Sequence, residues 1–292
     1  MPRVIRIKFD PPAGLGNNML HYLLARVLQD FVPQATLVGD GLPDWTVEPP
    51  GLRQESVGED KSDREIIDLY GHVIPFSYAI ERLRASNNIE VRTRSLAMRM
   101  EYFGSHLHLA RKIFPPRSAP GTGFGDDHIV FVVRTGAIYR GVHPNYTLLP
   151  ISFYRHIINE TGLRPAFIGQ IEDNEYCRAL RDIFPTAPFC HGSPMDDFHM
   201  IRTSSRIVLA VSTFAWLAAW LSETAKEIIF PILGLFNPND RPDIDILPVR
   251  DDRYQYFQFP GERWTGSAEE IAAKISGAGN FNRIISAPSL MA

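Results

Sequence analysis

The sequence predicts an α/β fold built on parallel β-sheets. Two continuous apolar runs, Ile129–Val133 and Ile207–Val211, have the length and composition of strands that are buried on both faces of a parallel sheet. Strand-like and helix-like segments also alternate along the chain, beginning with a strand, a glycine turn and a helix near the N-terminus. Such alternation is typical of βαβ units, and it occurs in both halves of the chain. We therefore expect two Rossmann-like domains.

The composition narrows the classes of function. The chain has 292 residues, enough for two domains, and its formal net charge is −3 without a cluster of Lys or Arg, so a nucleic-acid partner is not expected. No apolar run approaches the length of a transmembrane helix, and the N-terminus lacks the pattern of a signal peptide. Cys177 and Cys190 show no metal or redox spacing. We expect a cytoplasmic protein, and the residues indicate no oligomeric state.

The N-terminal segment predicts a strand, a glycine turn, a helix and a second strand. The strands are expected at 4–9 and 36–39, and the helix runs to Phe31 with Asn17 or Asn18 as its cap. Gly14 and Gly16 lie in the turn, where glycine lets a ligand approach the backbone. One interpretation is dinucleotide binding, with Asp40 on the ribose, although Met19 stands where the third glycine would be. The other is a turn that only connects strand and helix.

The remainder of the first half leads to a candidate domain boundary. We expect an irregular surface loop at 42–62, a strand or short helix at 64–74, and helices at 76–85 and 96–113. The segment 115–127 is rich in Pro and Gly, which suits a link between domains. We divide the chain into 1–120 and 121–292, with the alternative that the terminal helix packs back on the N-terminal domain.

Arg134 is the first candidate site residue of the second half. It follows the apolar run Ile129–Val133, so it is expected at the carboxyl end of a buried strand, where open α/β sheets bind ligands. Its guanidinium stays charged and can hold phosphate oxygens through two hydrogen bonds. The alternative is an arginine that caps the strand or pairs with an acid.

Further alternation follows Arg134. We expect strands at 165–169 and 228–231, and helices from 150 and at 176–184, 195–203 and 269–275, with the last dozen residues as a tail. Glu172 and Asp173 follow the first of these strands, where acids could hold a ribose or a guanine edge. They could equally favour the dipole of the next helix.

The segment 207–223 combines a buried strand with a helix start. Ser212 and Thr213 stand between the apolar strand and the helical pattern, where a hydroxyl accepts from the unpaired N–H groups of the first turn. The helix dipole and these N–H groups make such a turn an anion site, and a diphosphate would suit it. An ordinary helix cap is the alternative.

Four short motifs resemble those of the bacterial alpha-1,2-fucosyltransferases, one of them being Glu172 and Asp173, which stand where the family has an S-D-D-like acidic turn. The segment Ser212-Thr213-Phe214-Ala215-Trp216 resembles the family's N-S-T-F-S-W-W turn, with Asp196 and Asp197 as the preceding acid, and Val211 and Leu217 as departures. The glycine turn is similar to the family's G-G-L-G-N-Q-M-F-Q-Y-A-F-A-R opening, through Gly14, Leu15, Gly16, Asn17, Met19, Tyr22, Ala25 and Arg26. The arginine segment resembles H-x-R-R-G-D-Y, with Arg134 and Gly136 matched and Val132, Thr135 and Ala137 as departures.

The resemblance implies a GT-B glycosyltransferase, in which two Rossmann-like domains face a cleft. It implies fucose transfer from GDP-fucose to a saccharide acceptor, with inversion and without a metal or other cofactor. The implied catalytic residue is Arg134, and the implied donor-binding residues are Arg134, Gly136, Asp173, Asp197, Ser212, Thr213 and Phe214. The implied acceptor side of the cleft comprises Gly14, Gly16, Asn17 and His21. The general base is not identified by the motifs, and position alone offers Asp10, His21 and His143.

Three other functions stay open at this point. The departures around Arg134 allow a transferase that uses another nucleotide sugar. They also allow a member of the fold that binds a nucleotide or glycan without catalysis. An NAD(P)-dependent oxidoreductase would use Gly14, Gly16 and Asp40 instead.

Overall fold

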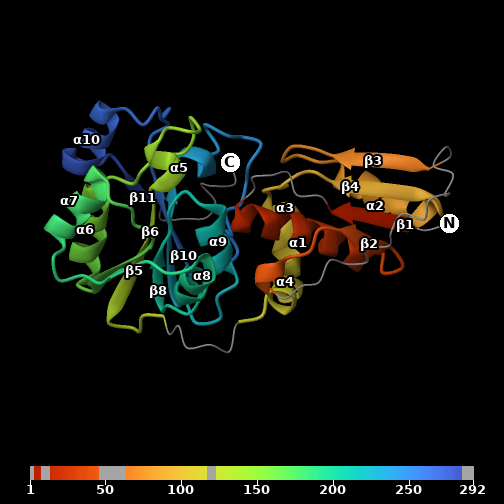
Figure 1. The fold of residues 1–292 in the computed structure, drawn as a ribbon, viewed down its shortest axis with the longest axis horizontal. Coiled ribbons are helices and arrows are strands. Elements are labelled where there is room, and N and C mark those ends of the chain that lie inside the picture. Colours follow the sequence, from red (N-terminus) through yellow and green to blue (C-terminus); the bar gives the residue numbers. More distant parts are fainter. Residues whose placement is uncertain (1–2, 8–13, 46–63, 117–122, 285–292) are drawn as a thin grey trace. The chain divides into compact units, whose positions relative to one another are not determined.

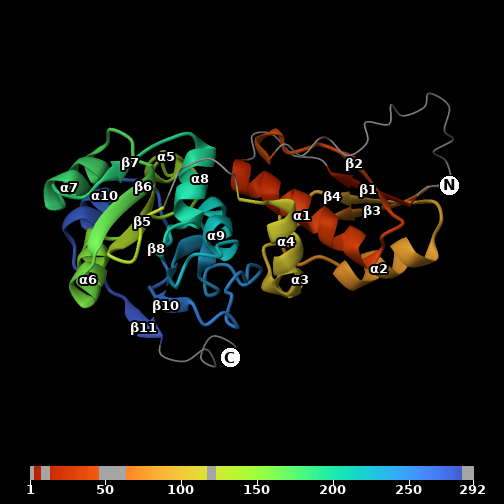
Figure 2. The same ribbon diagram turned by 90° about the horizontal axis from the view of Figure 1, so that it is seen from below.

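The computed structural model describes residues 3–7, 14–45, 64–116 and 123–284. The chain divides into two compact units: Met1–Pro115 with Asp243–Ile246, and Pro116–Pro242 with Leu247–Ala292. Each unit contains one β-sheet with helices packed on it (Figures 1 and 2). The α/β class with parallel sheets, predicted from the apolar runs, is therefore confirmed. That the two domains face a cleft stays a prediction.

The first unit is built on a four-stranded parallel sheet in the order β2-β1-β4-β3. Its strands are β1 (Arg3–Ile7), β2 (Thr36–Gly39), β3 (Glu65–Leu69) and β4 (Ile89–Thr93). Its helices are α1 (Leu15–Phe31), α2 (Phe76–Ala85), α3 (Met100–Phe103) and α4 (Leu107–Ile113), with short 3-10 turns at Pro43–Trp45 and Gly104–His106. Helix α1 packs on β1, β2 and β4, and buries its apolar stripe there.

The start of α1 differs from the predicted one. Gly14 is the N-cap, with extended backbone and no side-chain cap, so Asn17 and Asn18 lie inside the first turns instead of capping the helix. Both asparagines are therefore one turn too late for the role that we assigned to them. The expected helix at 96–113 is also wrong in part, because it begins only at Met100 and is interrupted by the turn Gly104–His106.

A short segment from the second half of the sequence completes the first unit. Asp245 forms a parallel bridge with Arg99, and its amide donates to the carbonyl of Met98 at 2.9 Å. The neighbouring side chains Ile244 and Ile246 are 2% and 1% exposed. The boundary of 120 and 121 drawn from composition does not include this return of the chain.

The second unit is built on a seven-stranded sheet in the order β11-β10-β9-β8-β5-β6-β7, in which only β11 is antiparallel. The strands are β5 (His128–Arg134), β6 (Arg164–Gln170), β7 (Phe189–Cys190), β8 (Arg206–Val208), β9 (Glu227–Ile232), β10 (Tyr254–Gln258) and β11 (Asn282–Ile284). We did not predict β4, β7, β10 or β11. Strand β8 is shorter than the apolar run, because the chain leaves the ladder after Val208.

Helices cover both faces of this sheet (Figures 1 and 2). They are α5 (Gly136–Tyr139), α6 (Ile151–Thr161), α7 (Glu175–Ile183), α8 (Pro194–Arg202), α9 (Thr213–Trp220) and α10 (Ala268–Ser276), with a 3-10 turn at Gly234–Phe236. Helix α8 packs on α9, and α10 packs on α6 and α7. The terminal helix is thus assigned to the second unit, and the alternative that it also packs back on the N-terminal domain stays a prediction.

Helix α9 is buried on almost every side, which explains its nearly uniform apolar sequence. Trp216 and Trp220 stand one turn apart and stack with their rings 5.2 Å from each other, at 0% and 2% exposure. Within the described residues, no helix is long and apolar enough to cross a membrane.

Candidate functional site

The carboxyl edge of the seven-stranded sheet contains the point where the strand order reverses. From β5 the chain proceeds to β6 and β7 on one side, and then returns to β8, β9 and β10 on the other. The loops that follow β5 and β8 therefore diverge from neighbouring strands. In open α/β sheets this reversal point at the carboxyl edge is the usual place of ligand binding.

Arg134 is the last residue of β5 and lies at this reversal point. Its Nη1 donates to the backbone carbonyl of Val211 at 2.8 Å, and its guanidinium carbon lies 4.6 Å from the centre of the Tyr146 ring. The carbonyl of Val211 is available because the chain has left the ladder of β8. Nε and Nη2 of Arg134 have no acceptor among the described residues, so these two nitrogens of the fork, with three N–H groups between them, are available for a ligand.

The start of α9 stands directly beyond Val211. Ser212 is the N-cap, and its Oγ accepts from the amide of Ala215 at 3.4 Å, which confirms the predicted helix start. Thr213 is the first helical residue and is buried, whereas Phe214 is partly exposed and meets the ring of Phe198 edge-on at 5.2 Å. The positive end of the helix dipole and a guanidinium thus lie on either side of one residue, Val211.

Gly136 begins α5, just after Arg134. A Cβ at this position would lie 2.8 Å from Oε1 of Gln170, the last residue of β6. The hydroxyl of Thr135 donates to the carbonyl of Gln170 at 2.8 Å and holds the two strand ends together. The Gly136 turn is therefore shaped by β6, its neighbour in the sheet.

The two predicted donor-binding acids lie in different environments. Asp173 is exposed and forms an ion pair with Arg178 at 2.7 Å. Asp197 lies in α8 and is 6% exposed, and its Oδ1 accepts from the amide of Gly192 at 2.9 Å. Burial raises the pKa of Asp197, although the bond from Gly192 and the nearby His191 act in the opposite direction. Within the described part of the chain, no hydrogen bond or ion pair joins either acid to Arg134.

The predicted acceptor-side residues belong to the first unit. Gly14 precedes α1 with φ of −69°, and a Cβ there would meet nothing within 4 Å, so its conformation does not require glycine. Gly16 and His21 are buried within α1, and Asn17 is partly exposed there. Asp40 follows β2, the neighbour of β1, which is the place of the ribose acid in a dinucleotide fold.

His143 is a candidate base that the structure places in the second unit near Arg134. Its ring lies 4.8 Å from that of Tyr146, the residue under the Arg134 guanidinium. Its Nδ1 accepts from the amide of Asn145 at 3.1 Å, so Nε2 carries the proton of the neutral ring. Burial and the charge of Arg241 lower the pKa of His143, so the imidazole is neutral at pH 7. Asp10, another candidate base, lies outside the described residues.

Tyr146 and a small cavity beneath Arg134 were not predicted. The cavity has a volume of about 10 Å³ and is lined by Arg134, Thr147, Tyr154, Tyr176 and Val211, among others. The Tyr176 hydroxyl donates to the carbonyl of Leu149 at 2.6 Å, and burial raises its pKa well above the usual range. No sequence signal links these tyrosines to Arg134, because they lie on other elements.

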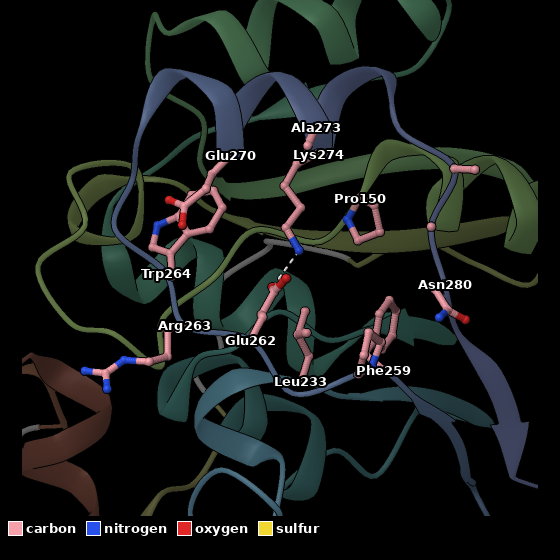
Figure 3. A pocket seen from close by; sticks show the side chains of 13 residues that line it. Pro150, Leu233, Phe259, Glu262, Arg263, Trp264, Glu270, Ala273, Lys274 and Asn280 are labelled. Carbon is pink, nitrogen blue, oxygen red and sulfur yellow. Dashed lines mark hydrogen bonds and ion pairs between the residues drawn. The ribbon is translucent and has the colours of Figure 1, made fainter.

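A larger pocket lies farther along the same sheet edge (Figure 3). It has a volume of about 240 Å³ and is lined by residues that follow β9 and β10, by α10 and by the segment 278–280. Lys274 and Glu262 form an ion pair at 2.5 Å within it. We did not predict this pocket. The described residues contain no cluster of three or more His, Cys, Asp or Glu side chains suited to a metal ion.

Comparison with known proteins adds little to this geometry. No protein-family model and no curated protein matches the sequence. The chain is similar to the solved structure of the E. coli heptosyltransferase WaaC with ADP, at a TM-score of 0.43 and 12% identity, over 100% of this chain and 98% of that chain. A likeness of this degree carries no conclusion about function. The candidate site therefore depends on its own residues.

Proposed function

We propose that the protein is a GT-B glycosyltransferase that binds a nucleoside diphosphate sugar at the carboxyl edge of the second sheet. The observation that carries the proposal is the hydrogen bond from Arg134 to the carbonyl of Val211, beside the capped start of α9. It combines a guanidinium with a helix N-terminus at the strand-order reversal. The resemblance of the Ser212 and Gly14 motifs to alpha-1,2-fucosyltransferases supports GDP-fucose as donor and a saccharide as acceptor.

The proposed reaction is a direct displacement with inversion. An acceptor hydroxyl oxygen forms a bond to the anomeric carbon, the bond from that carbon to the diphosphate oxygen breaks, and a base takes the hydroxyl proton. Negative charge grows on the diphosphate as it leaves. Nε and Nη2 of Arg134 and the first turn of α9 would stabilise this charge through groups that are already oriented. In this proposal no metal or other cofactor is required.

His143 is the base that we favour. In the neutral tautomer of its ring, Nε2 already carries the proton, so the lone pair that would take the acceptor's proton is that of Nδ1, which must first release the amide of Asn145. The ring of His143 packs against the ring of Tyr146, which in turn lies under the guanidinium of Arg134, so His143 lies close to the proposed diphosphate site. His21, by comparison, is 5% exposed within α1.

Binding can be tested by thermal denaturation with GDP, GDP-fucose, UDP, dTDP and NAD. A ligand that binds only the folded state stabilises it by about 2.7 kcal/mol at roughly 100 times its Kd. We expect a shift with GDP and GDP-fucose that Arg134→Ala abolishes. Arg164→Ala is the matched control, because Arg164 stands at the opposite end of β6 and is 67% exposed.

The other outcomes identify the alternatives. A shift with UDP or dTDP alone would replace the donor and keep the transferase. A shift with NAD alone would contradict the proposal and favour an oxidoreductase at Gly14, Gly16 and Asp40. GDP binding without transfer to any acceptor and without donor hydrolysis would favour a binding protein that lacks catalysis. No shift with any nucleotide would refute a nucleotide site at Arg134.

A further inference from the structure

The pocket beside α10 combines a pair of charged side chains with apolar ones. Leu233 follows β9, Phe259 follows β10, and Lys274 projects from α10 toward both (Figure 3). All three belong to the second unit. The pocket is therefore a feature of one sheet and of the helix that covers its edge.

The size of the pocket suits a single ring. Its volume of about 240 Å³ lies below the range of roughly 300–1,000 Å³ that is usual for drug-sized ligands. This volume is closer to that of one monosaccharide unit than to that of a whole nucleoside diphosphate. We therefore expect the pocket to bind a different ligand from the proposed diphosphate site at Arg134.

The charged residues that line the pocket are two acids and two bases, Glu262, Glu270, Arg263 and Lys274, so their formal charges cancel. Lys274 and Glu262 are paired at 2.5 Å, with side-chain exposures of 12% and 29%. The same Oε1 of Glu262 accepts from the hydroxyl of Thr147 at 2.5 Å. A charged ligand would have to compete with this pair, so a neutral ligand is favoured. The side chain of Arg263 points away from the pair (Figure 3).

The pair nevertheless offers hydrogen bonds of both kinds. An ammonium group has three donors, and Lys274 uses one of them for Glu262. Oε2 of Glu262 has no donor among the described residues, so it can accept from a ligand. Hydroxyl groups both donate and accept, and two neighbouring hydroxyls of a sugar match one acceptor next to one donor.

An apolar wall faces these polar groups. Pro150, Leu233 and Phe259 line the pocket near the ion pair (Figure 3). A pyranose ring presents C–H groups on its face and hydroxyls at its rim, and it can contact this wall and the pair together. Small-molecule sites commonly combine an apolar lining with a few oriented polar groups in this way.

We propose that this pocket, with Lys274 and Glu262 as its polar pair and Leu233 and Phe259 as its wall, binds a neutral monosaccharide unit. The proposal does not require the diphosphate site at Arg134. In a glycosyltransferase, the pocket would hold a sugar unit of a glycan alongside the transfer site.

The test is ligand-observed saturation-transfer NMR on the full chain. The probes are L-fucose, D-glucose, D-galactose and D-mannose, with D-glucuronate and inorganic phosphate as charged comparisons. We expect saturation transfer to at least one neutral sugar and none to phosphate. Glu262→Gln and Lys274→Met should each weaken binding about tenfold or more, since each removes the charge of one partner of a partly buried hydrogen bond.

A second variant guards against loss of folding. Ala273 lines the pocket from an exposed position on α10, so Ala273→Trp would fill the space and leave the ion pair intact. It should abolish sugar binding without lowering the melting temperature. Lys226→Met, which removes an exposed ion pair with Asp126, should leave binding unchanged.

Three results would overturn the proposal: no neutral sugar shows saturation transfer, phosphate or glucuronate binds in its place, or sugar binding survives Ala273→Trp. Arg134→Ala separates this pocket from the proposed function. It should abolish the GDP-dependent thermal shift and leave the monosaccharide signal intact.

Discussion

The guanidinium of Arg134 donates a hydrogen bond to the backbone carbonyl of Val211 across 2.8 Å, and so joins the end of β5 to the turn before α9. The two residues are 77 positions apart in the chain. The bond lies at the point where the strand order reverses, between β5 and β8. It fixes a cation next to a helix N-terminus before any ligand is present.

Arg134→Met should therefore loosen this turn. It removes the bond to Val211 and the contact with the Tyr146 ring, for which we expect a cost of about 1–2 kcal/mol. Hydrogen exchange should become faster at the amides of residues 212–216. Arg164→Met, at the other end of the neighbouring strand, is the control and should leave these amides protected. Equal protection in both variants would contradict the tie between β5 and α9.

Ser212→Ala should act on stability and on ligand binding together. Loss of an N-cap side chain costs about 0.5–2 kcal/mol. Ser267→Ala removes the corresponding cap of α10 and should cost a similar amount. Only the Ser212 variant should weaken GDP binding, by several-fold in a titration. If both variants bind GDP equally well, Ser212 serves only as a helix cap.

Glu90 should make the first unit sensitive to acid. Its side chain is 3% exposed and is hydrogen-bonded by Arg6, Arg64 and Arg92. Burial alone would raise its pKa, but hydrogen bonds from Arg6 and Arg92 outweigh this effect and bring the pKa to about 2.

Because the folded-state pKa of Glu90 is depressed, its contribution to stability is present above pH 4.5 and is lost as the pH falls toward 2. We expect Glu90→Gln to destabilise the protein at pH 7 by roughly 3 kcal/mol and to flatten the melting temperature between pH 4.5 and 2. Glu101→Gln is the control, since that carboxylate is 53% exposed. A melting curve of the Glu90 variant with unchanged acid dependence would refute this assignment.

Asp197 should have the opposite pH dependence. Burial raises its pKa in the folded state, so its contribution to stability falls as the pH rises above its ordinary pKa of 3.8. Asp197→Asn keeps an oxygen that can accept from the amide of Gly192, and it should raise the melting temperature at pH 7. The difference from the unsubstituted protein should disappear near pH 3.

The neighbouring Asp196 provides the matched control. Its Oδ2 accepts from the hydroxyl of Ser193 at 2.6 Å in the capping box of α8, so Asp196→Asn should lower the melting temperature. If both substitutions destabilise the protein at pH 7, the buried carboxylate of Asp197 is stabilising and our interpretation is wrong. A loss of GDP affinity in the Asp197 variant alone would support its proposed place at the donor.

Strands with a clear apolar pattern in the sequence were predicted, and strands without one were missed. The continuous apolar run Ile129–Val133 lies within β5 as expected. The alternation in β4 was present in Ile89, Val91 and Thr93, but the charged residues between them obscured it, because Glu90 is buried with arginine partners. Strand β11 has no apolar alternation, since it is an antiparallel edge strand that pairs with β10 alone.

The candidate site was predicted only as separate pieces. A strand end and a helix cap have local sequence signals, so Arg134 and Ser212 could be identified individually. Three features of the second unit are tertiary contacts instead. They are the hydrogen bond from Arg134 to Val211 beside Ser212, the ring of Tyr146 under the guanidinium, and the ion pair of Glu262 with Lys274. Such contacts depend on strand order, and a single sequence does not encode strand order in any local pattern.

The return of Asp243–Ile246 to the first unit has a consequence for biosynthesis. A ribosome produces the N-terminal unit first, yet the residues that pair with Met98 and Arg99 emerge only near the end of the 292-residue chain. The nascent unit must wait for them while the second unit is being made. Maturation of the two units is therefore linked in time, and a fragment that stops at residue 115 lacks a native part of its own core.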